Sequence, residues 1–136
     1  MTILGIGTDI CVVRSFAKII AKHPNYPRQF CNEQELDALN NSKNLIHDAI
    51  CIFSIKEAVG KAFGTGLVET LWFDDIHVDL SSKQSPAVSI DEDALRSVII
   101  GVPAGNIRLK LTYHTNPEFV TSFCVLQTLT MHPTVL

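Results

Sequence analysis

The sequence predicts a single folded domain that combines helices with strands, in the order strand, three helices, two strands, helix and two strands. Its length of 136 residues is typical of one domain with one hydrophobic core. Hydrophobic residues make up 46% of the chain and charged residues 18%, which excludes intrinsic disorder over most of its length. We therefore expect one domain over residues 1–129 and a loose tail over residues 130–136.

The N-terminal segment predicts a strand followed by a helix. Residues 1–13 form a short apolar run, which is typical of a buried strand. Gly5 and Gly7 within this run indicate a close backbone approach or a bulge. Residues 14–22 then place apolar side chains at helical spacing, and two prolines that follow end the pattern.

Two more helices are predicted before the middle of the chain. Asn32 and Glu35 have the spacing of a helix N-cap and its capping-box partner, which starts a short helix that ends near Asn40. The longest periodic segment covers residues 45–63, and glycines after it supply stop signals. The predicted apolar stripe of this long helix consists of Ile46, Ala49, Ile50 and Phe53.

The second half predicts two pairs of strands separated by a short helix. Apolar residues alternate with polar ones over residues 76–80 and again over 88–90, a pattern that favours a hairpin. Residues 91–99 open with three acidic residues, which stabilise the start of a helix through its dipole. Residues 106–113 and 119–129 predict a final pair of strands around a turn.

Composition excludes several classes of function. A formal charge of -3 and a pI near 5.9 give no overall attraction to nucleic acid. No apolar run reaches the roughly 18 residues of a membrane helix. The N-terminus also lacks the basic segment followed by an apolar segment of a signal peptide, so we expect no membrane association and a cytoplasmic protein. The cysteines are spaced too widely for a zinc site with paired ligands, and we expect free thiols in a reducing compartment at Cys11, Cys31, Cys51 and Cys124.

Two carboxylates are candidate ligands for a metal ion. Glu57 lies in line with the apolar stripe of the long helix, so its charge is expected to face the core and to need a cation, a metal or donors nearby. The alternative is an ordinary ion pair with Lys61, one turn further along. Asp9 lies near the end of the first strand, where ligands often meet a sheet; the alternative is a helix cap or a turn. Two carboxylates, phosphate oxygens and water would suit Mg²⁺.

The turn after the long helix is a candidate phosphate site. The amides and hydroxyl of Gly64, Thr65 and Gly66 could approach a phosphate group, or these residues could simply terminate the helix. Lys56 and Lys61 could add positive charge at the same place.

The first helix carries basic residues on one face. Arg14, Lys18 and Lys22 are spaced by four, and no acidic residue occurs between Asp9 and Glu33. This pattern favours an acidic partner, although a solvated helix face gives the same pattern.

Several of these motifs together resemble those of the holo-acyl-carrier-protein synthases, the small type of 4′-phosphopantetheinyl transferase. The resemblance extends over nearly the whole chain, and its most specific string is Lys-Glu-Ala-x-x-Lys-Ala-x-Gly-Thr-Gly. The motifs that carry it are Gly5-Ile-Gly-Thr-Asp-Ile10, Phe53-Ser-Ile-Lys-Glu-Ala-Val-Gly-Lys-Ala-Phe-Gly-Thr-Gly66, the strand that follows Pro86, and the strand end at His114-Thr115.

The resemblance implies a fold and an activity. The fold is α+β, a single domain in which a mostly antiparallel sheet packs against a long helix, and the family usually assembles as a homotrimer with coenzyme A in clefts between subunits. The activity is transfer of the 4′-phosphopantetheine group from coenzyme A to a serine of apo acyl carrier protein, in fatty acid biosynthesis. Adenosine 3′,5′-bisphosphate is the other product.

The resemblance also implies roles for single residues. Asp9 and Glu57 match the Mg²⁺ ligands, and both are expected to be catalytic together with Lys61, which matches the lysine that contacts the phosphates. The positions that match the nucleotide side of the site are Lys61, Gly64, Thr65, Gly66, Pro86 and His114. The basic face of Arg14, Lys18 and Lys22 suits an acidic carrier protein, because opposite charges speed encounter and set orientation.

Three positions depart from the family pattern. Val12 and Ser15 stand where a glutamate and an arginine are common, and Ile52 stands where an arginine precedes Phe53. These changes raise an alternative function, a noncatalytic relative that binds carrier protein or nucleotide and keeps the fold.

Overall fold

The computed structural model describes residues 1–64, 71–82, 84–99 and 101–129. The predicted order of strands and helices is confirmed, and three short 3₁₀ helices are added. The strands are β1 (Thr2–Val12), β2 (Ile76–Asp79), β3 (Ala87–Ile90), β4 (Ile107–Thr115) and β5 (Phe119–Thr128). The helices are α1 (Val13–Lys22), η1 (Tyr26–Gln29), α2 (Glu33–Asn40), α3 (Leu45–Ala62), η2 (Phe73–Asp75), α4 (Glu92–Val98) and η3 (Ala104–Asn106).

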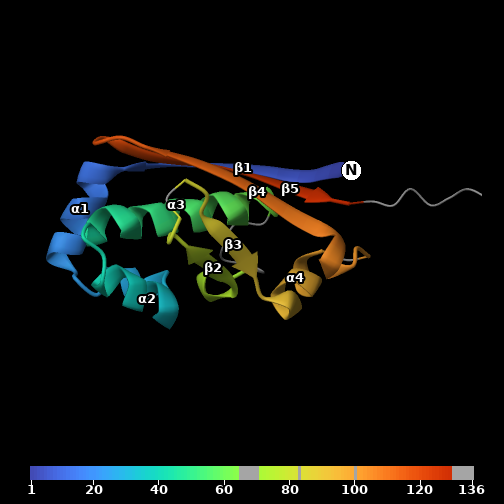
Figure 1. The fold of residues 1–136 in the computed structure, drawn as a ribbon, viewed down its shortest axis with the longest axis horizontal. Helices are drawn as coiled ribbons and strands as arrows, with labels where there is room; N and C mark the ends of the chain where they lie inside the picture. Colours follow the sequence, from blue (N-terminus) through green and yellow to red (C-terminus); the bar gives the residue numbers. More distant parts are fainter. Residues whose placement is uncertain (65–70, 83, 100, 130–136) are drawn as a thin grey trace, which may run out of the picture.

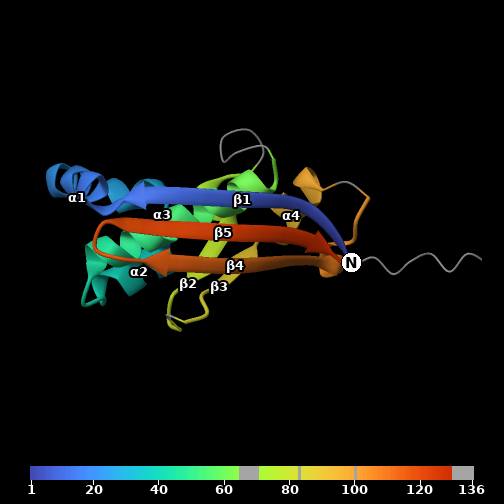
Figure 2. The same ribbon diagram turned by 90° about the horizontal axis from the view of Figure 1, so that it is seen from above.

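The fold has three layers, as Figure 1 shows. A three-stranded antiparallel sheet in the order β1-β5-β4 forms the first layer, and α3 lies beneath it. The two-stranded antiparallel hairpin of β2 and β3 lies on the other side of α3. Seen from the sheet side in Figure 2, β5 runs between β1 and β4 with α3 behind them. The predicted α+β fold, with a mostly antiparallel sheet packed against a long helix, is confirmed.

Two glycines let β1 lie directly on α3. A Cβ atom at Gly5 would come within 1.8 Å of the Ala62 carbonyl oxygen, and one at Gly7 within 1.9 Å of the Ala58 carbonyl oxygen. The pairing of β1 with β5 also shifts register between Ile3 and Gly5. Both predicted roles of this glycine pair, a close backbone approach and a bulge, are therefore present.

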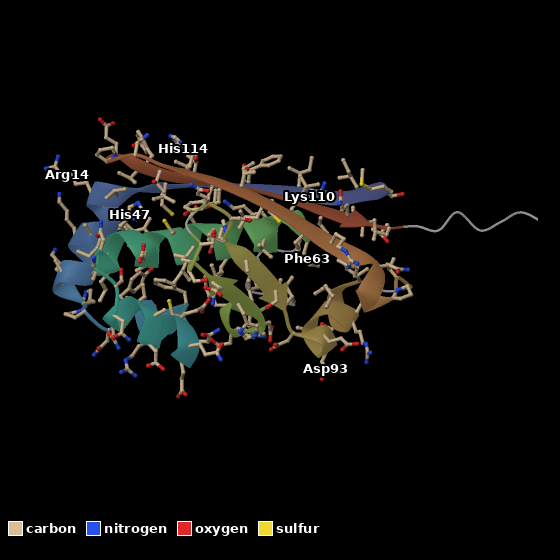
Figure 3. All side chains as sticks on the ribbon, viewed as in Figure 1. Arg14, His47, Phe63, Asp93, Lys110 and His114 are labelled. Atoms are coloured by element: carbon tan, nitrogen blue, oxygen red, sulfur yellow. The ribbon has the colours of Figure 1, made fainter. Side chains whose placement is uncertain are left out.

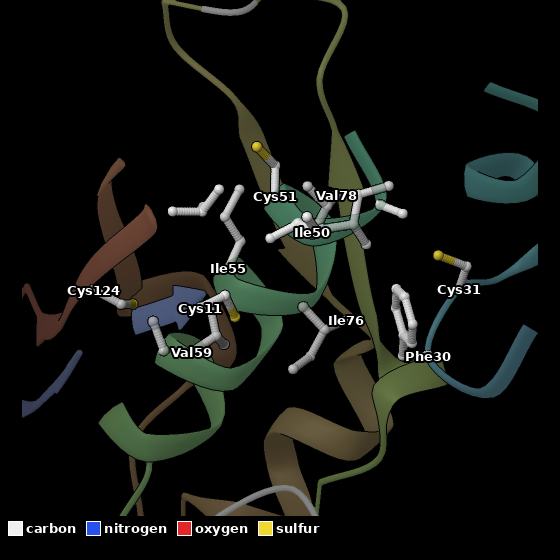
Figure 4. Packing of buried hydrophobic residues seen from close by; sticks show 14 of the residues in the cluster. Cys11, Phe30, Cys31, Ile50, Cys51, Ile55, Val59, Ile76, Val78 and Cys124 are labelled. Atoms are coloured by element: carbon white, nitrogen blue, oxygen red, sulfur yellow. The ribbon is translucent and has the colours of Figure 1, made fainter. Parts of the chain in front are cut away.

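The long helix is buried on more sides than the sequence pattern predicted. The expected apolar stripe is wrong in part, because Ile46 is 36% exposed and Phe53 is only half-buried. Residues on other faces of α3, such as Ile52 and Ile55, are buried instead. The cause is that the sheet covers one side of α3 while α1, α2 and β2 cover others, so no single stripe marks the core. Figure 4 shows this packing around α3.

A buried ion pair ties α3 to α2. The Lys56 side chain is fully buried, and its ammonium donates to Glu35 Oε1 at 2.7 Å, to the Phe30 carbonyl at 2.7 Å and to the Phe73 carbonyl at 2.9 Å. Glu35 also completes the predicted capping box with Asn32. Three acceptors thus match the three ammonium protons, which is the condition under which a buried charge is tolerated.

The outer face of the sheet is rich in exposed apolar side chains. Side chains alternate along each strand, so the inner face of β1 carries Gly5, Gly7, Asp9 and Cys11 towards α3. The exposed apolar residues of the outer face on β1 and β5 include Ile6, Ile10, Val12, Phe119 and Phe123. In the described part of the chain no helix is long and apolar enough to span a bilayer.

Candidate active site at the junction of β1 and α3

The Asp9 carboxylate is held by donors on both of its oxygens. Asp9 lies on the inner face of β1 opposite Ser122 of β5. Its Oδ1 accepts a hydrogen bond from the Lys61 ammonium at 2.9 Å, and its Oδ2 accepts one from the Cys11 thiol at 3.2 Å. The Asp9 side chain is only 10% exposed, whereas that of Lys61 is 48% exposed. The carboxylate is therefore fixed in place while the lysine on its solvent side can reach a ligand.

The alternative role of Asp9 as a helix cap is wrong. Helix α1 begins at Val13 with Val12 as its N-cap, and no side chain caps it. Asp9 instead faces α3, because Gly5 and Gly7 on the same face of β1 bring the strand down onto that helix.

Glu57 is a half-buried carboxylate next to Asp9. Its pKa is raised above the ordinary value, first by burial and then by the negative charge of Asp9, while the Lys61 ammonium partly offsets both. Lys61 bonds to Asp9 and to the Thr8 carbonyl, at 3.1 Å, so its contacts run to β1 and not back to Glu57 along α3. Lys61 therefore bonds to β1 while its charge also acts on Glu57, so the predicted helix pair is extended by Asp9.

The donor set suits a hard divalent cation. Two carboxylates and one ammonium leave a net negative charge here, and the pKa of Glu57 is raised by burial first and by the negative charge of Asp9 second. A bound cation would supply the missing positive charge through oxygen ligands of the kind that Mg²⁺ takes. Among the described residues no group of three His, Cys, Asp or Glu side chains is arranged to hold a metal ion, so a cation held by the two carboxylates would need further ligands.

The turn after α3 is described only in part. Gly64 has a φ of +79°, which side chains rarely adopt, and its amide donates to the Lys61 carbonyl at 2.9 Å. Gly64 thus ends α3, as one of the two sequence interpretations predicted. Thr65 and Gly66 lie outside the described residues.

Lys56 does not belong to this site. The sequence suggested that it adds positive charge beside the turn, but its ammonium is buried with Glu35 at the opposite side of α3. Lys56 and Lys61 are five residues apart, so they point in different directions from the helix.

Two predicted nucleotide-side residues lie away from the carboxylates within one chain. His114 is exposed on the outer face of β4, where it pairs with Thr121, whereas Asp9 faces inward. Figure 3 shows His114 above the sheet. Pro86 is half-buried just before β3, in the hairpin beneath α3. One chain therefore brings Asp9, Glu57 and Lys61 together but leaves Pro86 and His114 apart from them.

The basic face of α1 is exposed, as predicted. Arg14, Lys18 and Lys22 point to solvent, while Phe16 and Ile20 are buried on the other side of the helix. Figure 3 shows Arg14 at the end of the molecule where α1 lies. The face is thus available to a partner.

A separate hollow of about 710 Å³ lies between α2, α3 and the β2–β3 hairpin. Its described lining includes Asp48, Ile52 and His77 but no lysine or arginine, and none of the three clustered site residues reaches it. It lacks the cations that bind phosphate groups, so the candidate site remains the cluster at β1 and α3.

Comparison with known proteins identifies the family of the chain. The sequence model of the 4′-phosphopantetheinyl transferase superfamily matches residues 5–121, which include Asp9, Glu57 and Lys61. The chain belongs to this superfamily. A holo-[acyl-carrier-protein] synthase of Nitrobacter hamburgensis is 28% identical to this transferase-family chain over 137 aligned residues, covering 94% of the chain and 96% of the relative.

Solved structures of the superfamily share the fold. The holo-[acyl-carrier-protein] synthase of Neisseria meningitidis superposes with a TM-score of 0.80 at 23% identity, covering 93% of this chain and all (100%) of that one. The Helicobacter pylori enzyme, solved in complex with coenzyme A, gives a TM-score of 0.74 at 21% identity, with 90% and 99% coverage.

Sequence reasoning missed Cys11 as a neighbour of the site. The signal was available, because residues two apart on a strand share a face, so Cys11 had to lie beside Asp9.

Proposed function

We propose that the protein is a holo-acyl-carrier-protein synthase. It transfers the 4′-phosphopantetheine group of coenzyme A to a serine hydroxyl of apo acyl carrier protein and releases adenosine 3′,5′-bisphosphate. The observation that carries this proposal is the cluster of Asp9, Glu57 and Lys61, formed by β1 and α3 of a chain that belongs to the superfamily.

The residues of the cluster have separable roles in this reaction. Asp9 and Glu57 would hold Mg²⁺, which when bound neutralises charge on the pyrophosphate and on the leaving bisphosphate. Lys61 is half-exposed and reaches over Asp9, so its ammonium can meet a phosphate oxygen on the solvent side. Gly64 ends α3 three residues after Lys61, with its amide bonded to the Lys61 carbonyl, and we propose that it lies near the same phosphate group. Thr65 and Gly66, the next residues in the sequence, are proposed as further nucleotide contacts.

The alternative of a noncatalytic relative is not favoured. The three departures, Val12, Ser15 and Ile52, leave the carboxylates and the lysine in place. A test uses coenzyme A, Mg²⁺ and an apo carrier protein, and measures the intact mass of the carrier. We expect a mass increase of one phosphopantetheine group, and none with a carrier that lacks the acceptor serine. An unchanged mass in both samples would favour the noncatalytic alternative.

The basic face of α1 is proposed as the carrier-protein contact. Arg14, Lys18 and Lys22 are exposed on one side of a helix that follows β1 directly, so the same strand connects this face to Asp9. A carrier bound there by its acidic surface would lie close to the metal-binding carboxylates. Opposite charges of this kind mainly speed encounter and set orientation.

We further propose a homotrimer with composite clefts. An exposed apolar face on β1 and β5 is a typical interface, and it includes Ile10 at 68% exposure. His114 lies on this same outer face, so in an assembly it can approach another subunit's carboxylates, and Pro86 can complete the nucleotide side from the hairpin.

Light scattering of the wild type should give three times the chain mass, and Ile10→Asp should give monomers. A fully active monomeric wild type would contradict the composite cleft.

A cytoplasmic location is part of the proposal. Cys11, Cys31, Cys51 and Cys124 are all buried thiols that are not part of a disulfide, which fits a reducing compartment. Fatty acid biosynthesis, which uses acyl carrier protein, is the expected context.

A further inference from the structure

The two oxygens of Asp9 differ in their surroundings. Oδ1 faces the half-exposed ammonium of Lys61, while Oδ2 faces the buried thiol of Cys11 at 3.2 Å. Cys11 lies two residues after Asp9 on the inner face of β1 and is 8% exposed. One oxygen therefore points to the open side of the site and the other into the protein.

Polar groups behind Cys11 support its position. Ser54 of α3 is a neighbour of the thiol, and its hydroxyl lies 2.9 Å from that of Ser122 on β5. Ser54 is fully buried and Ser122 is 3% exposed. Two buried hydroxyls thus join α3 to β5 near Cys11, in surroundings that are otherwise apolar.

The Cys11 thiol is the donor in its contact with Asp9. Its Sγ lies 3.2 Å from Asp9 Oδ2, within hydrogen-bonding reach of a thiol, and the carboxylate oxygen accepts.

We propose that Cys11 is a positioning residue for Asp9: its thiol holds Oδ2 and leaves Oδ1 as the oxygen presented to Lys61 and to the metal ion. The metal part of this inference rests on the proposed function, whereas the thiol–carboxylate contact stands on the geometry alone. Donors behind a ligating carboxylate fix its orientation, and their loss commonly lowers metal affinity.

Infrared spectroscopy tests the contact without any metal or substrate. Difference spectra between the wild type and Cys11→Ala isolate the S–H stretching band of Cys11. Cys124 provides the matched control, because it is also a buried thiol outside any disulfide, and burial alone raises its pKa. We expect the Cys11 band at lower wavenumber than that of Cys124, and we expect Asp9→Ala to shift the Cys11 band alone. Identical bands for the two thiols would overturn the proposal.

Metal affinity tests the consequence of the contact. Binding of Mn²⁺, followed by its paramagnetic resonance signal, should weaken by roughly tenfold in Cys11→Ala. Cys11→Ser, which keeps a donor, should restore most of that affinity, and Cys124→Ala should bind as the wild type does. Circular dichroism of each variant shows that it is folded.

The outcomes separate this inference from the proposed function. Equal Mn²⁺ affinity for the wild type and a folded Cys11→Ala would overturn the positioning role, even if carrier modification is confirmed. No Mn²⁺ binding by the wild type would overturn the metal site and the role assigned to Oδ1. Carrier modification by the wild type is measured independently of both results.

Discussion

Gly7→Ala is expected to destabilise the protein and to displace Asp9. The added Cβ would lie 1.9 Å from the Ala58 carbonyl oxygen and 2.6 Å from the Ala62 amide nitrogen. Ordinary contact begins at 3.4 Å, so β1 and α3 must separate by about 1.5 Å at this point. Both clashing groups are backbone atoms of a helix, and no side chain can rotate away to relieve the contact.

The expected cost is about 3 kcal/mol, the upper part of the range for overpacking a core. For a domain of this size that corresponds to a fall in Tm of roughly 12 °C. Gly105→Ala is the matched control, because an added Cβ there meets no atom within 4 Å, and we expect a change below about 0.5 kcal/mol. Urea unfolding followed by circular dichroism measures both variants.

The same variant tests how the site is built. A shift of β1 away from α3 moves Asp9 away from Lys61, so Gly7→Ala should lose carrier modification even at temperatures where it remains folded. Equal Tm values for Gly7→Ala and Gly105→Ala would refute the close approach of β1 to α3. Normal activity in a destabilised Gly7→Ala would refute the dependence of the site on that approach.

Three further changes have distinct expected outcomes. Glu57→Gln should raise the free energy of unfolding at neutral pH. The raised pKa means that Glu57 keeps its proton to higher pH in the folded state than in the unfolded state, so the wild type loses stability as the pH rises through that range. Urea unfolding at several pH values should show this loss in the wild type and not in the variant. The double variant Lys18→Glu, Lys22→Glu should raise the KM for carrier protein and leave the KM for coenzyme A nearly unchanged. Added salt should have the same effect on the wild type, because salt screens exposed charges. Equal changes in both KM values would contradict a carrier contact. Lys56→Met should lower the free energy of unfolding by about 3–5 kcal/mol, measured with urea, because it leaves the Glu35 charge buried without its partner. A loss of activity without a loss of stability would instead place Lys56 in the active site.

Local patterns in the sequence were sufficient to predict the order of elements. The capping box of Asn32 and Glu35 forms as predicted because its hydrogen bonds involve only neighbouring residues. The glycine pair in β1 likewise indicated a close approach, although not that α3 is the partner. Patterns of this kind depend on one element and need no knowledge of the tertiary fold.

Tertiary partners were not predictable from spacing. The pattern that placed Glu57 with Lys61 could not show that β1 brings Asp9 within 2.9 Å of the same lysine. Lys56 was expected to add positive charge beside the turn, because nothing local reveals that Glu35, 21 positions earlier in the chain, forms a buried ion pair with it. The apolar stripe of α3 was misplaced for the same reason, since several elements bury this helix together.

The roles of Asp9 and Glu57 came from the family resemblance, and the structure adds their common location. Pro86 and His114 remain predictions, because one chain leaves them apart from the carboxylates.

The most direct test of the account compares the wild type with Glu57→Gln in one assay. Coenzyme A, Mg²⁺ and apo carrier protein are supplied, and the holo carrier formed is measured together with the adenosine 3′,5′-bisphosphate released. The account predicts equal amounts of the two products from the wild type. At limiting Mg²⁺, a folded Glu57→Gln should form at least a hundredfold less of both, because a charged metal ligand is lost. A loss of this size is roughly the upper end of the range for changes to residues around a metal. Near wild-type rates for Glu57→Gln, or bisphosphate release without holo carrier, would contradict a transferase site built on Asp9, Glu57 and Lys61.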